Sequence, residues 1–192
     1  LPAHRGGAGK CSGGLPVKAA TFATRVTPLP GGLRVATAEM PHMSSVSVGV
    51  WVGTGGRHEP ASASGISHFL EHLLFKGTRK RTARQISEEI EGIGGYLNAF
   101  TGEDLTCYQC RVGHEHFEGV LEVMADMFLN STFDPAEIDK ERSVIKEEIA
   151  MYRDQPHEHV QELLHETVWP DHPLGRSLTG TERTLDGMHR EH

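Results

Sequence analysis

Two segments of the chain alternate apolar and polar residues with a period of two, which predicts β-strands, and two further segments have the pattern of a hairpin. "LRVATAE" at 33–39 and "SVSVGVWV" at 45–52 are rich in valine and are separated by the turn-like "MPHM". "YLNAF" at 96–100 and "LTCYQCRV" at 105–112 are joined by the short "TGED". The second pair therefore predicts a β-hairpin.

The remaining long segments repeat apolar residues every three or four positions, which predicts helices. Their expected ranges are 63–76, 82–92, 114–130, 134–153 and 156–168. The fourth helix has clear start signals, since Asp134 can cap it, Pro135 suits its first turn and Glu137 completes a capping box. The final "TERTLDGMHREH" predicts the opening of a further helix without a C-terminal cap, which suggests a fragment of a longer protein.

This order of elements predicts an α+β fold, in which helices pack on a mainly antiparallel β-sheet. The chain has 192 residues and is 37% hydrophobic, enough for one ordinary domain. Residues 1–25 contain five glycines and four basic side chains but no acidic one, which predicts a flexible N-terminal tail. The domain is therefore expected at 26–192, incomplete at its C-terminal end.

Composition excludes several classes of protein. The net charge of −7 argues against a nucleic-acid partner, because binding phosphates needs excess Lys and Arg. No segment approaches the roughly 18 apolar residues of a membrane span, so no membrane partner is expected. Cys11, Cys107 and Cys110 are an odd set, and the last two would point to opposite faces of a strand. We therefore expect reduced thiols and an intracellular setting.

The helix predicted at 63–76 has an unusual polar side. One face is apolar and consists of Ile66, Phe69, Leu70, Leu73 and Leu74. His68, Glu71 and His72 lie on the opposite face, which would ordinarily be solvated. However, Phe75 projects from the middle of that face, so we expect it to be covered as well. Two imidazoles and a carboxylate on a covered face need partners, either in a buried hydrogen-bonded trio or around a metal.

Histidines at i and i+4 can present ring nitrogens to one metal ion, and zinc needs at least a third protein ligand. Glu141 and Glu148 are candidates, since they lie seven residues apart in the apolar stripe of the helix at 134–153. The neighbouring Glu147 is the main competitor for the ligand position. A buried acid paired with an arginine is the alternative for Glu141.

A family resemblance sharpens this prediction. "HFLEH" at 68–72 is the inverted zinc-peptidase motif H-x-x-E-H. Together with "GGYLNAFTGEDLTCY" and "ERSVIKEEIAMYRDQP", it resembles the pitrilysin family of zinc metallopeptidases, from about residue 26 to the end. The resemblance implies that His68, His72 and Glu148 bind Zn²⁺.

The same resemblance implies roles for five further residues. Glu71 matches the general base, and Glu141 matches a supporting carboxylate near the metal. Asn98, Ala99 and Phe100 match the edge strand on which an extended peptide substrate docks. The alternative for this segment is an ordinary strand of the sheet.

The implied reaction is hydrolysis of a peptide bond. Two imidazoles and one carboxylate leave a fourth zinc position for a water molecule, whose pKa zinc can lower to about 7. Glu71 would take a proton from this water and pass it to the leaving amine. A peptide that adds to the "YLNAF" strand would be held by main-chain hydrogen bonds, so its sequence preference should be loose.

The resemblance also implies a partner, because family members close the zinc site with a homologous C-terminal domain in the same chain or on another subunit. The intact motif favours a zinc endopeptidase, and the alternative is a non-catalytic subunit, an assembly module or an inactive fragment. The segment at 41–60 resembles bacterial and mitochondrial-processing relatives, which implies the bacterial cytoplasm or the mitochondrial matrix. Histidine clusters at 113–117 and 156–165 lack carboxylates in a buried stripe and are expected at the surface.

Overall fold

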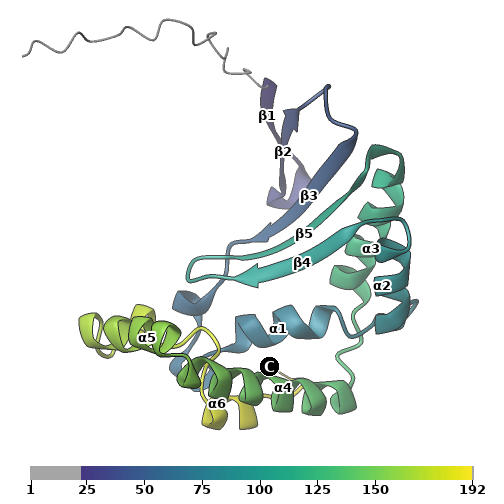
Figure 1. Cartoon of the computed structure of the whole chain (residues 1–192). Coiled ribbons are helices and arrows are strands. Elements are labelled where there is room, and N and C mark those ends of the chain that lie inside the picture. Colours follow the sequence, from purple (N-terminus) through teal and green to yellow (C-terminus); the bar gives the residue numbers. More distant parts are fainter. Residues whose placement is uncertain (1–22, 192) are drawn as a thin grey trace, which may run out of the picture. The chain divides into compact units, whose positions relative to one another are not determined.

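The computed structural model describes residues 23–191, which divide into two compact units between Met43 and Ser44. In the first unit, β1 (Ala23–Pro28) pairs antiparallel with β2 (Arg34–Glu39), with the 3-10 turn Pro30–Gly32 between them (Figure 1). The sequence predicted β2 but not β1, which begins within the segment expected to be a flexible tail. The rest of that segment, 1–22, lies outside the described residues.

The second unit contains a three-stranded antiparallel sheet in the order β3-β5-β4 (Figure 1). Its strands are β3 (Ser45–Val52), β4 (Tyr96–Thr101) and β5 (Thr106–Gly113). The β4–β5 hairpin is confirmed, and its register places Ala99 opposite Tyr108. Helices pack on this sheet, so the predicted α+β class is confirmed.

The helices of this unit follow the predicted ranges closely. They are α1 (Ile66–Leu74), α2 (Ala83–Glu91), α3 (Phe117–Asn130), α4 (Pro135–Asp154), α5 (Pro156–Val168) and α6 (Glu182–Asp186). Single 3-10 turns cover Gly56–His58, Ala61–Ala63, His114–His116 and Pro173–Gly175. The expectation of an uncapped last helix is wrong, because α6 ends after five residues with Gly187 as its C-cap.

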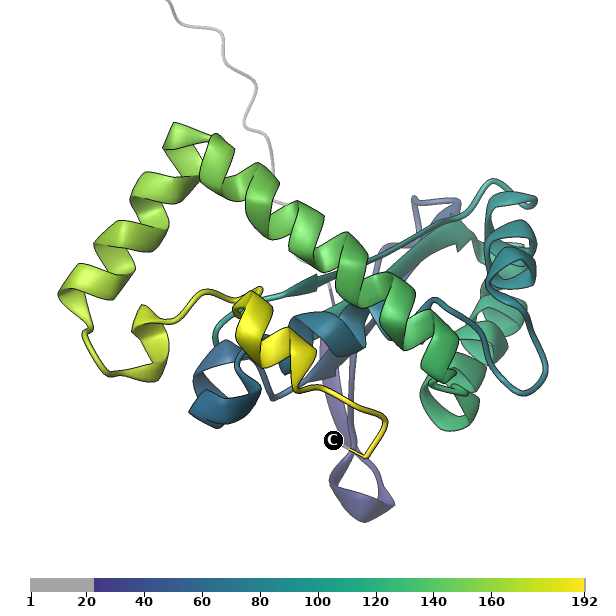
Figure 2. The same ribbon diagram turned by 90° about the horizontal axis from the view of Figure 1, so that it is seen from below.

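Two apolar cores hold the unit together, and α1 contributes to both. Leu74 belongs to the core between the sheet, α2 and α3, whereas Phe69 and Leu73 pack against α4 and α6. Helix α1 thus lies between the sheet and α4, as Figures 1 and 2 show from two directions. Phe75 packs near the ring of Tyr108, so the polar side of α1 is covered as predicted. Leu70, expected in the buried face, is 40% exposed.

The start of α1 is fixed by Gly65 and Glu59. Gly65 has a φ of 93°, and a side chain there would meet the Thr179 carbonyl oxygen, which explains why the helix begins at Ile66 rather than 63. The buried Glu59 carboxylate accepts hydrogen bonds from the backbone N–H groups of Gly65 and Ser67, both at 2.7 Å. A carboxylate at a helix N-terminus stabilises the helix, so this contact orients the segment that bears the histidines.

Helix α4 begins as predicted at its cap but not at its capping box. The Asp134 carboxylate accepts a hydrogen bond from the Ala136 backbone N–H at 2.8 Å. Glu137 contacts Lys140 instead of reaching back to the cap. A nearby lysine thus competes successfully for this carboxylate.

The turn between α1 and α2 is anchored to α3 by the buried Asp126. Its carboxylate accepts hydrogen bonds from Thr78 Oγ1 at 2.6 Å, Asn130 Nδ2 at 2.7 Å and Arg81 Nη1 at 2.9 Å. Burial alone would raise the pKa of Asp126, but these three donors together hold it below its usual value. The network therefore favours an ionised carboxylate and fixes the chain where it leaves α1.

Candidate metal centre

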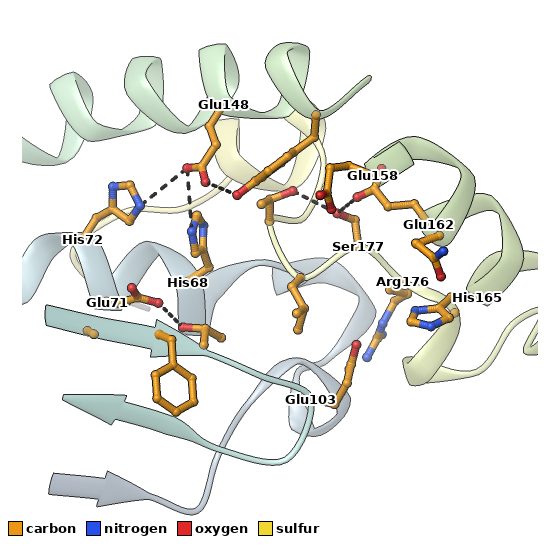
Figure 3. Close-up of a pocket in the computed structure, with 18 residues that line it drawn as sticks. His68, Glu71, His72, Glu103, Glu148, Glu158, Glu162, His165, Arg176 and Ser177 are labelled. Atoms are coloured by element: carbon orange, nitrogen blue, oxygen red, sulfur yellow. Dashed lines mark hydrogen bonds and ion pairs between the residues drawn. The ribbon is translucent and has the colours of Figure 1, made fainter. Parts of the chain in front are cut away.

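Three predicted ligands converge between α1 and α4 (Figure 3). The Nε2 atoms of His68 and His72 each lie 3.7 Å from Glu148 Oε2. Their rings meet edge to face with centroids 4.6 Å apart. Among residues 23–191, this is the one group of three His, Cys, Asp or Glu side chains with atoms close enough to share a metal ion.

The surroundings of these side chains favour protonation states that bind a cation. Burial and the neighbouring His72 lower the pKa of His68, although Glu148 opposes the shift. A lowered pKa favours the neutral imidazole, which is the form that binds metals. The side chain of Glu148 is 21% exposed, whereas its neighbour Glu147, the competing candidate, lies at the surface. The geometry thus favours Glu148 over Glu147.

Glu141 lies behind His72 rather than beside the metal position. The His72 Nδ1–H group donates to Glu141 Oε2 at 3.1 Å, and Lys76 Nζ lies 2.7 Å from Glu141 Oε1. A histidine that donates from Nδ1 presents its Nε2 lone pair to a metal. The expected buried acid is therefore paired with a lysine and a histidine, not with an arginine.

Glu71 faces the same cavity from α1, next to strand β4 (Figure 3). Its Oε2 accepts a hydrogen bond of 2.5 Å from Thr101 Oγ1. Burial raises the pKa of Glu71, although Thr101 and His72 oppose the shift. One carboxylate oxygen is thus held by β4, which leaves the other available to a molecule in the cavity.

The second oxygen of Glu148 has a partner that the sequence did not reveal. Tyr152, one turn later in α4, donates a hydrogen bond from its hydroxyl to Glu148 Oε1 at 2.8 Å. This hydrogen bond, together with burial, raises the pKa of Tyr152 to about 12. The phenol therefore stays protonated and donates throughout the neutral range.

The arrangement fits zinc by its donor set and by its size. Two imidazole nitrogens and one carboxylate oxygen are the ligands of many catalytic zinc sites. Tetrahedral zinc with bonds near 2.0–2.1 Å separates its ligand atoms by about 3.3 Å. The two nitrogen-to-oxygen distances of 3.7 Å exceed this by a few tenths of an ångström. Small side-chain rotations would close the gap, so these residues could hold zinc.

Strand β4 supplies the wall next to Glu71. In the described part of the chain, β4 pairs with β5 on one side and has no strand on the other. Ala99, Phe100 and Thr101 line the cavity. Asn98 does not line it, and its side chain donates to the Tyr96 hydroxyl at 2.9 Å. Two of the three residues predicted for substrate docking thus border the cavity directly.

The cavity extends beyond the three ligands to a volume of about 480 Å³ (Figure 3). Its far end is polar and is lined by Glu103, Glu158, Glu162, His165, Arg176 and Ser177. About two turns of α5, from Glu158 to His165, border this space, which the expectation of a surface histidine cluster at 156–165 did not include. Glu158 and Glu162, at i and i+4, were the available signal, but the sequence did not show which other segment they face.

Comparison with known proteins places this geometry in a family. The sequence profile of the insulinase family, peptidase family M16, matches residues 34–182. The uncharacterized zinc protease YmxG of Bacillus subtilis is 49% identical over 154 residues, which cover 80% of this chain and 38% of YmxG. An uncharacterized zinc protease of Rickettsia bellii is 42% identical over 167 residues, or 87% of this chain and 40% of that protein.

Solved structures agree with this assignment. A protease from Helicobacter pylori superposes with a TM-score of 0.84 at 26% identity, covering 88% of this chain and 41% of that one. A putative M16-like peptidase from Alicyclobacillus acidocaldarius shares the fold, with a TM-score of 0.80 and 23% identity over 89% of this chain and 41% of that one. The chain spans about two fifths of the length of these relatives. The match over residues 34–182, with the predicted motif intact, shows that the chain belongs to the insulinase family of metallopeptidases, peptidase family M16.

Proposed function

We propose that this chain is the zinc-binding part of an endopeptidase that hydrolyses peptide bonds in extended peptides or presequences. The observation that supports this most strongly is the convergence of His68, His72 and Glu148 on one point, with Glu71 facing the same cavity. Two neutral ligands and one anion would leave a bound zinc ion with net positive charge. A zinc ion held in this way suits hydrolysis better than a zinc ion in a fully enclosed structural site would.

When bound, zinc would polarise the scissile carbonyl and make a water molecule more acidic. The protein's own part is proton transfer and alignment. Glu71 would accept a proton from the attacking water through Oε1, since Thr101 occupies Oε2. The same carboxylate would then deliver that proton to the leaving amine. Glu141 would contribute by holding the His72 ring in its metal-binding orientation.

The substrate would lie along β4 as an added strand. The free side of this strand offers main-chain donors and acceptors, and Asn98, Ala99 and Phe100 occupy its centre. The Thr101 side chain at its end contacts Glu71, so a peptide paired with β4 would pass close to the base. Main-chain pairing holds many sequences in one register, which predicts broad specificity.

A second domain would complete the site. The chain covers 38% of YmxG and 41% of the Helicobacter pylori protease, and its cavity is partly open to solvent. We propose that a homologous C-terminal domain, in the same chain or on a partner subunit, closes over the peptide. Closure would exclude water and strengthen the electrostatic contacts with the reacting groups.

Cleavage of internally quenched fluorescent peptides tests the proposed function. The zinc-loaded chain would be assayed alone and mixed with the C-terminal half of YmxG, beside a Glu71→Gln variant. We expect cleavage that a chelator abolishes and that Glu71→Gln lacks, although that variant retains its zinc. No cleavage in either preparation would favour a non-catalytic module, and full activity of Glu71→Gln would show that the base is misassigned.

A further inference from the structure

The two carboxylate oxygens of Glu148 have different partners. Oε2 faces the Nε2 atoms of His68 and His72, both at 3.7 Å, whereas Oε1 accepts the Tyr152 hydroxyl at 2.8 Å (Figure 3). Among the described residues, Tyr152 is the one side chain that donates a hydrogen bond to Glu148. The carboxylate is thus divided between the metal position and a neutral donor on its own helix.

We propose that Tyr152 is a positioning residue that restricts Glu148 to binding the metal through Oε2 alone. This inference rests on the proposed function, since it assumes that the three ligands hold a metal. A carboxylate can coordinate with one or both oxygens. A hydrogen bond to a charged group is stronger than one between neutral groups, so the Tyr152 hydroxyl can favour one mode over the other.

The position of Tyr152 suits this task. It lies at i+4 from Glu148 on α4, so the two side chains are neighbours on one helix face. Ile145 and Ile149 beside them are 0% and 5% exposed, which fixes that face against the core. The phenol is rigid beyond its two side-chain torsions, and it is neutral, so it adds no charge that would repel a cation.

One-oxygen binding has a consequence for the reaction. With two histidines and a single carboxylate oxygen, a metal keeps a position free of protein ligands. Two-oxygen binding would occupy part of that space. Tyr152 would therefore keep the coordination position for substrate and water free of protein ligands, without itself contacting either molecule.

The hydrogen bonds made by His68 and His72 away from the metal position do not duplicate the role of Tyr152. His72 is held by Glu141 at 3.1 Å, but no described residue accepts a hydrogen bond from His68 Nδ1. The orientation of the triad thus depends on two outer residues, one behind His72 and one behind Glu148. Loss of Tyr152 should not be compensated by another donor.

The test compares the parent with Tyr152→Phe, which keeps the ring and removes the hydroxyl. Zinc affinity is measured by competition with a chromogenic chelator, and coordination is followed by the visible d–d absorption of the cobalt(II)-substituted protein. We expect zinc affinity to fall about 10-fold, at the lower end of the effect of outer-contact loss. We also expect weaker cobalt absorption, because a five-coordinate ion absorbs less strongly than a tetrahedral one.

Tyr96→Phe is the matched control, because it also removes a tyrosine hydroxyl, but one that contacts Asn98 and no metal-ligand candidate. Tyr96 stands five residues before Thr101 in β4. It should change neither zinc affinity nor the cobalt spectrum. In a Glu148→Gln background, Tyr152→Phe should have no further effect on affinity, because the two residues act as one unit.

Two results would overturn the inference. Tyr152→Phe with unchanged affinity and spectrum would show that the hydroxyl positions nothing. Reduced affinity with an unchanged cobalt spectrum would refute one-oxygen restriction. A parent chain that binds no metal would instead contradict the proposed function, so the two failures are distinguishable.

Discussion

Replacing Asp126 with alanine should destabilise the unit that contains the metal centre by about 3 kcal/mol, in the range found when one partner of a buried ion pair is removed. The Asp126 side chain is 2% exposed and accepts three hydrogen bonds, from Thr78, Arg81 and Asn130. Each donor left unpaired costs about 1–3 kcal/mol. Arg81 keeps Glu89 as a partner, so the total should stay below the sum of three such costs.

The effect should depend on pH in a defined direction. Because the folded-state pKa of Asp126 is lowered, its ionised form contributes stability above the unfolded-state pKa of about 3.9. This stability is lost as pH falls through the folded-state value. The difference in free energy of unfolding between the parent and Asp126→Ala should thus be largest near neutrality and shrink below about pH 4.

Urea denaturation followed by tryptophan fluorescence and far-UV circular dichroism measures this difference. Glu122→Ala is the control, because Glu122 also contacts Arg81 but is 63% exposed, and it should change stability by less than about 0.5 kcal/mol. Equal effects of the two substitutions, or a pH-independent loss in Asp126→Ala, would refute the reasoning.

Two further predictions concern the metal centre and the thiols. Glu141→Gln should weaken zinc binding about 10- to 100-fold in a chelator competition, because the neutral amide oxygen is a weaker acceptor for the His72 Nδ1–H than the carboxylate. Glu137→Gln on the same helix should have no effect, and equal affinities of the two variants would contradict the assigned role of Glu141. In a Cys11→Ser variant, Cys107 and Cys110 should react with a thiol reagent only as fast as the protein unfolds. The two side chains are 0% and 1% exposed, and burial raises the pKa of both thiols. Rapid labelling of the native protein would contradict this prediction.

Local sequence patterns predicted most of the helices and the identity of the metal-ligand candidates. His68 and His72 stand out because a four-residue spacing aligns them on one helix face. Glu148 stands out because it interrupts an apolar stripe, whereas the exposed Glu147 beside it does not. Periodicity reports which face of a helix is covered, and it favoured Glu148, but Glu147 stayed a competitor until the structure placed it at the surface.

Contacts between distant segments could not be predicted in the same way. The hydrogen bond of Thr101 to Glu71 links β4 with α1, and Arg176 reaches the carbonyl oxygen of Glu59 across 117 positions. Such pairs depend on how elements pack, which periodicity does not specify. The Gly65 conformation that shortens α1 likewise follows from the close approach of Thr179. The role of Tyr152 also needed the position of Glu148 Oε1.

The most direct test of the account is the zinc content of the purified 192-residue chain after dialysis against a weak chelator, beside Glu148→Gln and Glu147→Gln. The account predicts about one zinc ion per chain in the parent and in Glu147→Gln, and a large loss in Glu148→Gln. A parent chain that retains no zinc, or loss of zinc in Glu147→Gln but not in Glu148→Gln, would contradict the proposed centre.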